Sequence, residues 1–264
     1  MTTAPFSNSD LDHIRNETFV KQVEFHRELE STNDRALKLC SDARPETPFL
    51  VLAERQTAGR GQGSNRWWSD AGALTFSLVL DASEWNPLPE RPSLASLTAG
   101  LAVCETFKQL APSADVGLKW PNDVCLNGRK ACGILTEVSA VNAATLVLGI
   151  GVNVNNALSA APQELQQTAT SLMEVTHRQH GLADLLVRLL KQLDAEREQA
   201  GMSNPQSYRR WQTFCVLSGR TVHLQTGSRS IVGFCRGIDE EGALLLQTAT
   251  GLQRCLSGTV AGIE

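Results

Sequence analysis

Apolar and polar positions follow several distinct patterns along this chain, and each pattern predicts a different element. Residues 49–53 form a continuous apolar run typical of a buried strand, and residues 74–80 alternate with the period of two that strands show. Residues 93–110 and 182–198 have the apolar spacing of helices, and residues 144–154 predict another buried strand. Strands and helices are therefore interspersed over most of the chain.

Two short segments add a cap and a turn to this pattern. Ser31-Thr32-Asn33-Asp34 offers N-cap residues for a short helix. Asn127-Gly128 separates residues 116–126 from residues 130–138 and is the strongest short-range signal for a β-hairpin, because both turn positions need a positive φ. We therefore expect Lys130 at the start of a strand, beside a tight turn.

The pattern changes towards the end of the chain. From Leu217 onward, four or five short strand-like runs separated by glycine-bearing turns predict a small β-barrel, whose core is too small for much independent stability. Residues 1–22 are polar, mixed in charge and without periodicity, and predict a peripheral N-terminal arm. We therefore divide the chain into this arm, a main domain over residues 23–214 and a C-terminal domain over residues 215–264 that docks on it.

Composition narrows the class of protein. Apolar residues make up 42% and charged residues 20%, which suffices for a packed core. The net charge of −4 argues against the broad basic surface that neutralises nucleic-acid phosphates. The 7 cysteines, without C-x-x-C spacing, fit buried thiols in a reducing compartment, and the first residues do not have the pattern of a signal peptide. We therefore expect a cytoplasmic protein that does not bind DNA.

The first candidate for chemistry is the loop from Thr57 to Arg66, which carries three glycines around Arg60. Glycines let backbone amides approach an anion, and an arginine offers a fixed fork of donors to carboxylate or phosphate. The spacing fits neither the mononucleotide P-loop nor the dinucleotide fingerprint. A flexible hairpin loop without a ligand is the plainer alternative.

Two further segments carry polar residues at strand ends. Lys119-Trp120-Pro121-Asn122-Asp123 precedes Lys130, whose ammonium could bridge a carboxylate and a phosphate as they react. A solvated lysine at a strand end is the alternative. The strand before Asn153 ends in asparagines, whose amides could pair with the edge of a purine or simply form a turn.

In this order and spacing, these segments strongly resemble the biotin protein ligases, which attach biotin to a lysine of a carrier domain. The resemblance extends from about Leu29 to Ile263. It implies a mixed β-sheet with helices, akin to the class II aminoacyl-tRNA synthetases, followed by a small SH3-like β-barrel. It also implies that biotin and ATP form biotinyl-5′-adenylate, with Mg²⁺ required, and that biotin then passes to a lysine of a biotin carboxyl carrier protein.

The resemblance also implies roles for individual residues. Lys130 and Arg60 match the catalytic residues, and Asp123 is the candidate ligand for Mg²⁺. The implied biotin contacts are Ser31, Thr32, Asn33, Gln56, Arg60, Gly61, Gln62 and Lys130. The implied contacts with ATP and the adenylate are Arg60, Arg66, Trp67, Asn122, Lys130 and Asn153.

Gln62 departs from the family, which commonly has a second arginine at this position. A neutral amide cannot supply that charge, so the adenylate would be held less tightly unless Arg66 takes over. The N-terminal arm is too short for the DNA-binding module of some family members, which implies a ligase alone. Two alternative functions stay open, a lipoate-type ligase of the same fold and a non-catalytic sensor of biotin or of the adenylate. The oligomeric state also stays open, and a homodimer is one form that it can take. The intact Arg60 and Lys130 argue against the sensor.

Overall fold

The structure, a computed structural model, describes residues 6–42, 45–82, 92–141, 144–200 and 205–264, which contain two β-sheets. The larger sheet has the strand order β1-β2-β3-β7-β6-β5-β4, and β1 and β2 are parallel while the other neighbours are antiparallel. Its strands are β1 (Gln22–Leu29), β2 (Phe49–Gln56), β3 (Leu74–Asp81), β4 (Val116–Lys119), β5 (Asp123–Leu126), β6 (Arg129–Val138) and β7 (Thr145–Val152). The mixed sheet that we expected is therefore confirmed.

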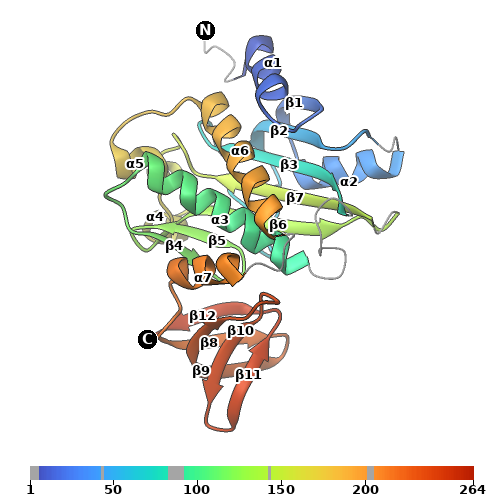
Figure 1. The fold of residues 1–264 in the computed structure, drawn as a ribbon. Coiled ribbons are helices and arrows are strands. Elements are labelled where there is room, and N and C mark those ends of the chain that lie inside the picture. The colour runs from blue at the N-terminus through green and yellow to red at the C-terminus, as the bar shows by residue number, and fades with distance from the viewer. Residues whose placement is uncertain (1–5, 43–44, 83–91, 142–143, 201–204) are drawn as a thin grey trace.

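Helices lie on both faces of this sheet (Figure 1). They are α1 (Asn8–Glu17), α2 (Thr32–Asp42), α3 (Pro92–Leu110), α4 (Gln163–Thr168), α5 (Leu172–Thr176), α6 (Leu182–Ala200) and α7 (Pro205–Phe214), with a short 3-10 helix η2 (Leu158–Ala160). Alternation along β2 shows how the two faces are formed. Leu50 and Leu52 join the main core with α3 and α6, whereas Phe49 and Val51 pack against α2 on the opposite face.

A buried ion-pair network ties three of the helices together. Arg210 of α7 donates to Glu196 of α6 at 2.5 and 2.7 Å and to Glu105 of α3 at 2.7 Å. Glu196 is only 1% exposed, so its charge needs this partner because an unpaired carboxylate in the interior would be costly. The network fixes the packing of α3, α6 and α7 on one face of the sheet.

The C-terminal domain is a separate antiparallel sheet in the order β11-β10-β9-β8-β12, below the larger sheet in Figure 1. Its strands are β8 (Thr221–Thr226), β9 (Arg229–Ile238), β10 (Leu244–Thr248), β11 (Gly251–Cys255) and β12 (Thr259–Ile263). Among the described residues the two end strands are not paired with each other, so the small all-β domain is not a closed barrel. Trp120 docks it on the main domain, because its indole N–H donates to the carbonyl of Gly242 at 3.0 Å.

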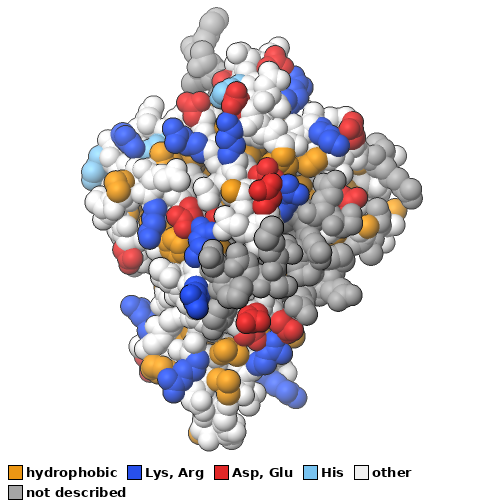
Figure 2. Space-filling model, viewed as in Figure 1, with side chains coloured by type: hydrophobic (Ala, Val, Ile, Leu, Met, Phe, Trp, Pro, Cys, Tyr) orange, Lys and Arg blue, Asp and Glu red, His pale blue; other side chains and the backbone are white. Residues whose placement is uncertain are grey.

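The outer face of this small sheet is open to solvent. Apolar side chains lie among basic and acidic ones over this domain in Figure 2, and the exposed ones include Val232, Phe234 and Leu252. The 7 cysteines are free and buried, as the sequence predicted. None of the helices that the structure describes is both long and apolar enough to span a membrane.

The segment before the hairpin at Asn127-Gly128 differs from the sequence prediction, whereas the hairpin itself agrees with it. Residues 116–126 form two strands instead of one, because the chain reverses at Trp120-Pro121 and pairs Lys119 with Asp123. Proline has no N–H to donate, so it cannot continue a strand ladder. The predicted hairpin at Asn127-Gly128 is confirmed, with φ values of 50° and 77°.

The N-terminal segment also differs from the peripheral arm that we expected, because it contains α1. A capping box formed by Ser7 and Asp10 starts this helix, and Ile14 is fully buried in the main core. The apolar pattern of the sequence did not predict this helix, because it has few apolar residues and most of its surface is polar.

We expect Ile14→Ala to lower the free energy of unfolding by about 2–4 kcal/mol, because it removes buried methylene and methyl groups and leaves a cavity. Urea denaturation measures this change. Asn16→Ala on the exposed side of α1 is the matched control and should stay within about 0.5 kcal/mol of the wild type. An equally small effect of Ile14→Ala would mean that the segment is peripheral after all.

Candidate functional site

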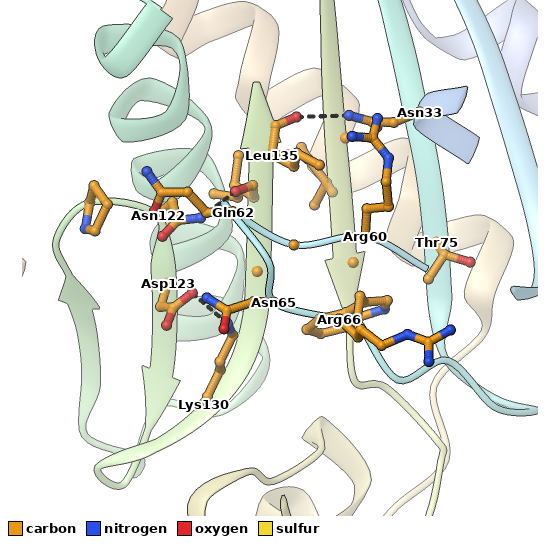
Figure 3. Close-up of a pocket in the computed structure, with 18 of the residues that line it drawn as sticks. Asn33, Arg60, Gln62, Asn65, Arg66, Thr75, Asn122, Asp123, Lys130 and Leu135 are labelled. Carbon is orange, nitrogen blue, oxygen red and sulfur yellow. Dashed lines mark hydrogen bonds and ion pairs between the residues drawn. The ribbon is translucent and has the colours of Figure 1, made fainter. Parts of the chain in front are cut away.

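A cavity of about 320 Å³ opens beside α2, on the face of the large sheet that α2 covers only in part. Gln56 and residues 60–62 and 65–67 line one side, and the segment from Lys119 to Asp123 lines another. Gly258, Thr259 and Val260 reach the cavity from the C-terminal domain. The cavity therefore draws on both domains, and Figure 3 shows the residues that surround it.

Small and polar residues form the floor of the cavity. Thr75 and Ser77 of β3 pair with Gly151 and Gly149 of β7, and Gly151 pairs in turn with Gly133 of β6. Because alternate strand residues point to the same face, these five residues share the face that carries Val51 and Val79 under α2. Beyond the end of α2, the residues of these strands have small side chains or none, and a hollow therefore lies over the sheet there.

Two of these glycines are required by the close approach of other side chains. A Cβ atom at Gly149 would lie 2.0 Å from Asn33 Oδ1, and one at Gly151 would lie 2.4 Å from the indole ring of Trp67. Both distances are far inside van der Waals contact. Asn33 and Trp67 therefore lie directly on the backbone of β7.

A buried hydrogen-bond network holds the polar end of the cavity. Gln56 Oε1 accepts from the backbone N–H of Thr32 at 2.7 Å and from the Thr32 hydroxyl at 3.0 Å. Ser77 Oγ lies 2.8 Å from Thr32 Oγ1 and 2.5 Å from Asn33 Oδ1. Ser31 caps α2 by accepting from the Asp34 N–H at 3.4 Å. These contacts fix several donors and acceptors at this end of a cavity whose lining also includes apolar side chains such as Ile134 and Leu135.

The loop between β2 and β3 folds as a small hairpin over the cavity. The backbone N–H of Gly61 donates to the carbonyl of Asn65 at 2.8 Å, and that of Trp67 donates to Gly59 at 2.9 Å. A Cβ atom at Gly59 would lie 2.6 Å from the carbonyl oxygen of Trp67, so only glycine fits there. The glycine-rich loop therefore forms a hairpin and carries Arg60 to the cavity, and its role in binding an anion stays a prediction.

Arg60 is held by two carboxylates. Its Nη1 and Nη2 donate to Glu137 at 3.0 and 2.6 Å, and its Nε lies 2.8 Å from Asp34 Oδ1. Burial favours a lower pKa for the Arg60 guanidinium, but the hydrogen bonds and charges of Glu137 and Asp34 outweigh burial and raise the pKa. Arg60 therefore stays charged at neutral pH.

Lys130 lies on the opposite side of the cavity from Arg60 (Figure 3). Its Nζ is 2.6 Å from Asp123 Oδ1 and 5.9 Å from the centre of the Trp67 ring. The amide nitrogen of Asn122 donates to the carbonyl of Ile134 at 2.6 Å, which fixes the segment that carries Asp123. Arg60 and Lys130 thus lie at opposite sides of the cavity, with the polar floor between them, and Arg66 and Lys119 also line it.

The structure brings most of the predicted site residues to this cavity. These residues are Ser31, Thr32, Asn33, Gln56, Arg60, Gly61, Gln62, Arg66, Trp67, Asn122, Asp123 and Lys130. Their individual roles toward biotin, ATP and metal stay predictions.

Asn153 is the exception, because the described residues that line the cavity do not include it. It is buried, its backbone N–H donates to the carbonyl of Ala131 at 2.8 Å, and its Oδ1 accepts from Asn156 at 3.0 Å. Asn153 thus pairs with its neighbours just after β7.

Sequence reasoning missed Glu137, Ser77 and Thr259. Ser77 could have been found as a polar residue within the strand-like run 74–80, and Glu137 as a charge within the expected strand 130–138. Thr259 gives no such signal, because its place depends on how the two domains dock.

Comparison with known proteins gives two family matches and several close relatives. The "Biotin/lipoate A/B protein ligase family" matches residues 25–155, and the "Biotin protein ligase C terminal domain" matches residues 217–261. The bifunctional ligase/repressor BirA of Bacillus subtilis is 32% identical over 251 residues, which cover 94% of this chain and 76% of that protein. The biotin–[acetyl-CoA-carboxylase] ligase of Mycobacterium tuberculosis is 33% identical over 235 residues, covering 86% of this chain and 83% of that protein.

A solved structure agrees with these relatives. The biotin protein ligase of Aquifex aeolicus in complex with biotin and ATP has a TM-score of 0.79 and 28% identity, covering 92% of this chain and 99% of that one. Two family matches in separate parts of the chain and relatives above 30% identity over most of both chains agree with the resemblance of the motifs. This chain therefore belongs to the biotin protein ligase family.

Proposed function

We propose that this protein activates biotin with ATP and transfers it to a lysine of a biotin carboxyl carrier domain. The observation that carries the proposal is a single cavity in which a buried polar floor lies between Arg60 and Lys130. The relatives support it, because the Aquifex aeolicus structure was solved with biotin and ATP and the Mycobacterium tuberculosis relative is named for acetyl-CoA carboxylase.

The polar floor suits the ureido ring of biotin. That ring has two N–H donors and one carbonyl acceptor, and Ser31, Thr32, Asn33 and Gln56 offer both kinds of group at the buried end of the cavity. Their mutual hydrogen bonds orient them before a ligand arrives, so little conformational entropy is lost on binding. We assign recognition of biotin to these residues.

The side of the cavity where Lys130 lies suits the adenylation step. A carboxylate oxygen of biotin attacks the α-phosphorus of ATP, the new P–O bond forms, and pyrophosphate leaves. Lys130 would stabilise the negative charge that builds up on the carboxylate and phosphate oxygens. In the second step the amine of the carrier lysine attacks the acyl carbon, loses a proton, and displaces AMP.

The residues present fit a magnesium ion that arrives with ATP. Magnesium is usually held by one or two carboxylates together with substrate phosphates, and Asp123 offers one carboxylate at the cavity. Among the residues that the structure describes, no group of three His, Cys, Asp or Glu side chains could hold a metal ion. The ion would neutralise phosphate charge, while Asp123 would also orient Lys130.

The main domain, residues 23–214, carries this chemistry in our proposal, and the C-terminal domain completes the cavity through Thr259. We also propose that the protein acts in the cytoplasm and does not bind DNA. The 7 free and buried cysteines support a reducing compartment. A homodimer is compatible with the proposal but is not needed for it.

Incubation with ATP, Mg²⁺, biotin and a biotin carrier domain tests the activity. The carrier should gain the mass of one biotin, and pyrophosphate release should depend on biotin. Release with lipoate or octanoate instead would move the chain to the lipoate branch. Binding of biotin without any pyrophosphate release would identify a sensor.

We expect Lys130→Ala to slow adenylate formation by about a hundredfold to a thousandfold, because it removes a preorganised charge near the reacting phosphate. Biotin affinity should stay close to that of the wild type, since the ureido contacts lie elsewhere in the cavity. Pyrophosphate exchange and calorimetry measure the two effects. Lys38→Ala, on the exposed side of α2, is the control and should change neither; normal turnover of Lys130→Ala would exclude Lys130 from the mechanism.

We expect the wild type to release biotinyl-adenylate readily, because Gln62 lacks the charge of an arginine. Gln62 and Asn122 both line the cavity, and Figure 3 shows that Arg66 extends away from the Lys130–Asp123 pair. Gln62→Arg should slow adenylate dissociation by about one to two orders of magnitude, since charge-assisted contacts contribute about 1.5–3 kcal/mol. Stopped-flow measurement of dissociation provides the check.

Arg66→Ala serves as the comparison variant for this prediction. Its dissociation rate should equal that of the wild type if Arg66 does not contact the adenylate. Slow release in the wild type that becomes fast in Arg66→Ala would show that Arg66 supplies the missing charge.

A further inference from the structure

We propose that Glu137 and Asp34 form a holding position for Arg60, which Arg60 leaves when it takes up the anionic adenylate. In this role Glu137 is a positioning residue that acts through Arg60 and sets the apparent affinity for ATP. The proposal rests on the proposed function, because it concerns the same reaction. It follows from the two carboxylates that face the guanidinium of Arg60: Glu137 accepts hydrogen bonds from it, and Asp34 forms an ion pair with it.

All three nitrogens of the guanidinium face carboxylates of this chain. Glu137 receives both Nη atoms in a bidentate pair, and Nε lies against Asp34. Bidentate arginine–carboxylate pairs are the strongest and most directional contacts that this side chain makes. In this arrangement Arg60 extends toward Asn33 and leaves Lys130 on the far side of the cavity (Figure 3).

The carboxylate of Glu137 cannot follow Arg60, because it is anchored to the polar floor, and the backbone of Asp34 is fixed within α2. Asn33 donates to Glu137 Oε2 at 2.9 Å and to the carbonyl of Leu135 at 3.3 Å. Asp34 follows Asn33 in the first turn of α2. Arg60, by contrast, belongs to the loop, and Gly61 directly after it allows the backbone a wide range of conformations. Movement of Arg60 therefore requires the loop alone to change.

The exchange is close to balanced in energy. A phosphate and a carboxylate offer a guanidinium similar charge-assisted contacts. The side chains of Arg60, Glu137 and Asp34 are 37%, 25% and 50% exposed, so solvent screens the ion pairs and lowers the cost of breaking them. While Arg60 is neutralised by two carboxylates, it cannot stabilise charge on the phosphate, and part of the binding energy of ATP is needed to release it.

Glu137→Gln tests the proposal, since it keeps an oxygen that can accept from Asn33 and removes the charge. We expect the KM for ATP in biotin-dependent pyrophosphate exchange to fall about three- to tenfold, with kcat within about twofold of the wild type. Asp34→Asn should have a smaller effect, because its carboxylate is more exposed.

Glu28→Gln is the matched control. It removes a carboxylate that pairs with Arg55 at 3.5 Å on β1 and β2, and it should leave the KM unchanged. An unchanged KM in Glu137→Gln would overturn the proposal. A raised KM or a kcat lowered as in Arg60→Ala would also overturn it, because Glu137 would then hold Arg60 in its productive position.

Limited trypsin digestion gives a readout that does not depend on catalysis. Trypsin must bind the arginine side chain, so an ion-paired Arg60 resists cleavage. The ratio of cleavage after Arg60 to cleavage after Arg66 should rise about three- to tenfold in Glu137→Gln, at unchanged thermal stability. An equal ratio overturns the holding position. A raised ratio in a protein that forms no adenylate would support it and reject the proposed function.

Discussion

The close approach of two side chains to the bare backbone of β7 is the constraint on which the site depends. Asn33 and Trp67 occupy the space that side chains at Gly149 and Gly151 would fill. A sheet buries apolar side chains wherever a helix covers it, as α2 covers Val51. The absence of side chains at Gly149 and Gly151 therefore creates the cavity, and it also allows polar groups to form the floor.

The electrostatics of the site follow from this geometry. The glycines let the loop lie close to the sheet, and the loop brings Arg60 within reach of Glu137 across 77 residues of sequence. Lys130 is matched by Asp123 at the other end. Arg60 and Lys130 are therefore each paired with a carboxylate of the chain itself, and an incoming anion must compete with that carboxylate for either of them. Solvent screens these partly exposed ion pairs, so the binding energy of an anionic ligand is sufficient to break them.

Features that depend on local physics could be predicted from the sequence. The hairpin at Asn127-Gly128 follows from the backbone angles that these residues accept, and the strand 74–80 follows from its period of two. Long-range features could not be predicted. Glu137 is recognisable as part of the site only once Arg60 is known to face it. The place of Asn153, whose oxygen accepts from Asn156 outside the lining of the cavity, also depends on the fold, and its contact with the adenylate stays a prediction.

The docking of the C-terminal domain has a consequence for how the whole chain folds. Leu118 and Trp120 of the main domain belong to the same continuous core as Leu217, Leu224 and Leu244. The smaller sheet buries too little apolar surface to be stable by itself, so it depends on this shared core. Loss of either part would expose the apolar side chains of the other. We therefore expect the two sheets to unfold as one cooperative unit, in which the boundary between domains is a matter of topology and not of separate stability.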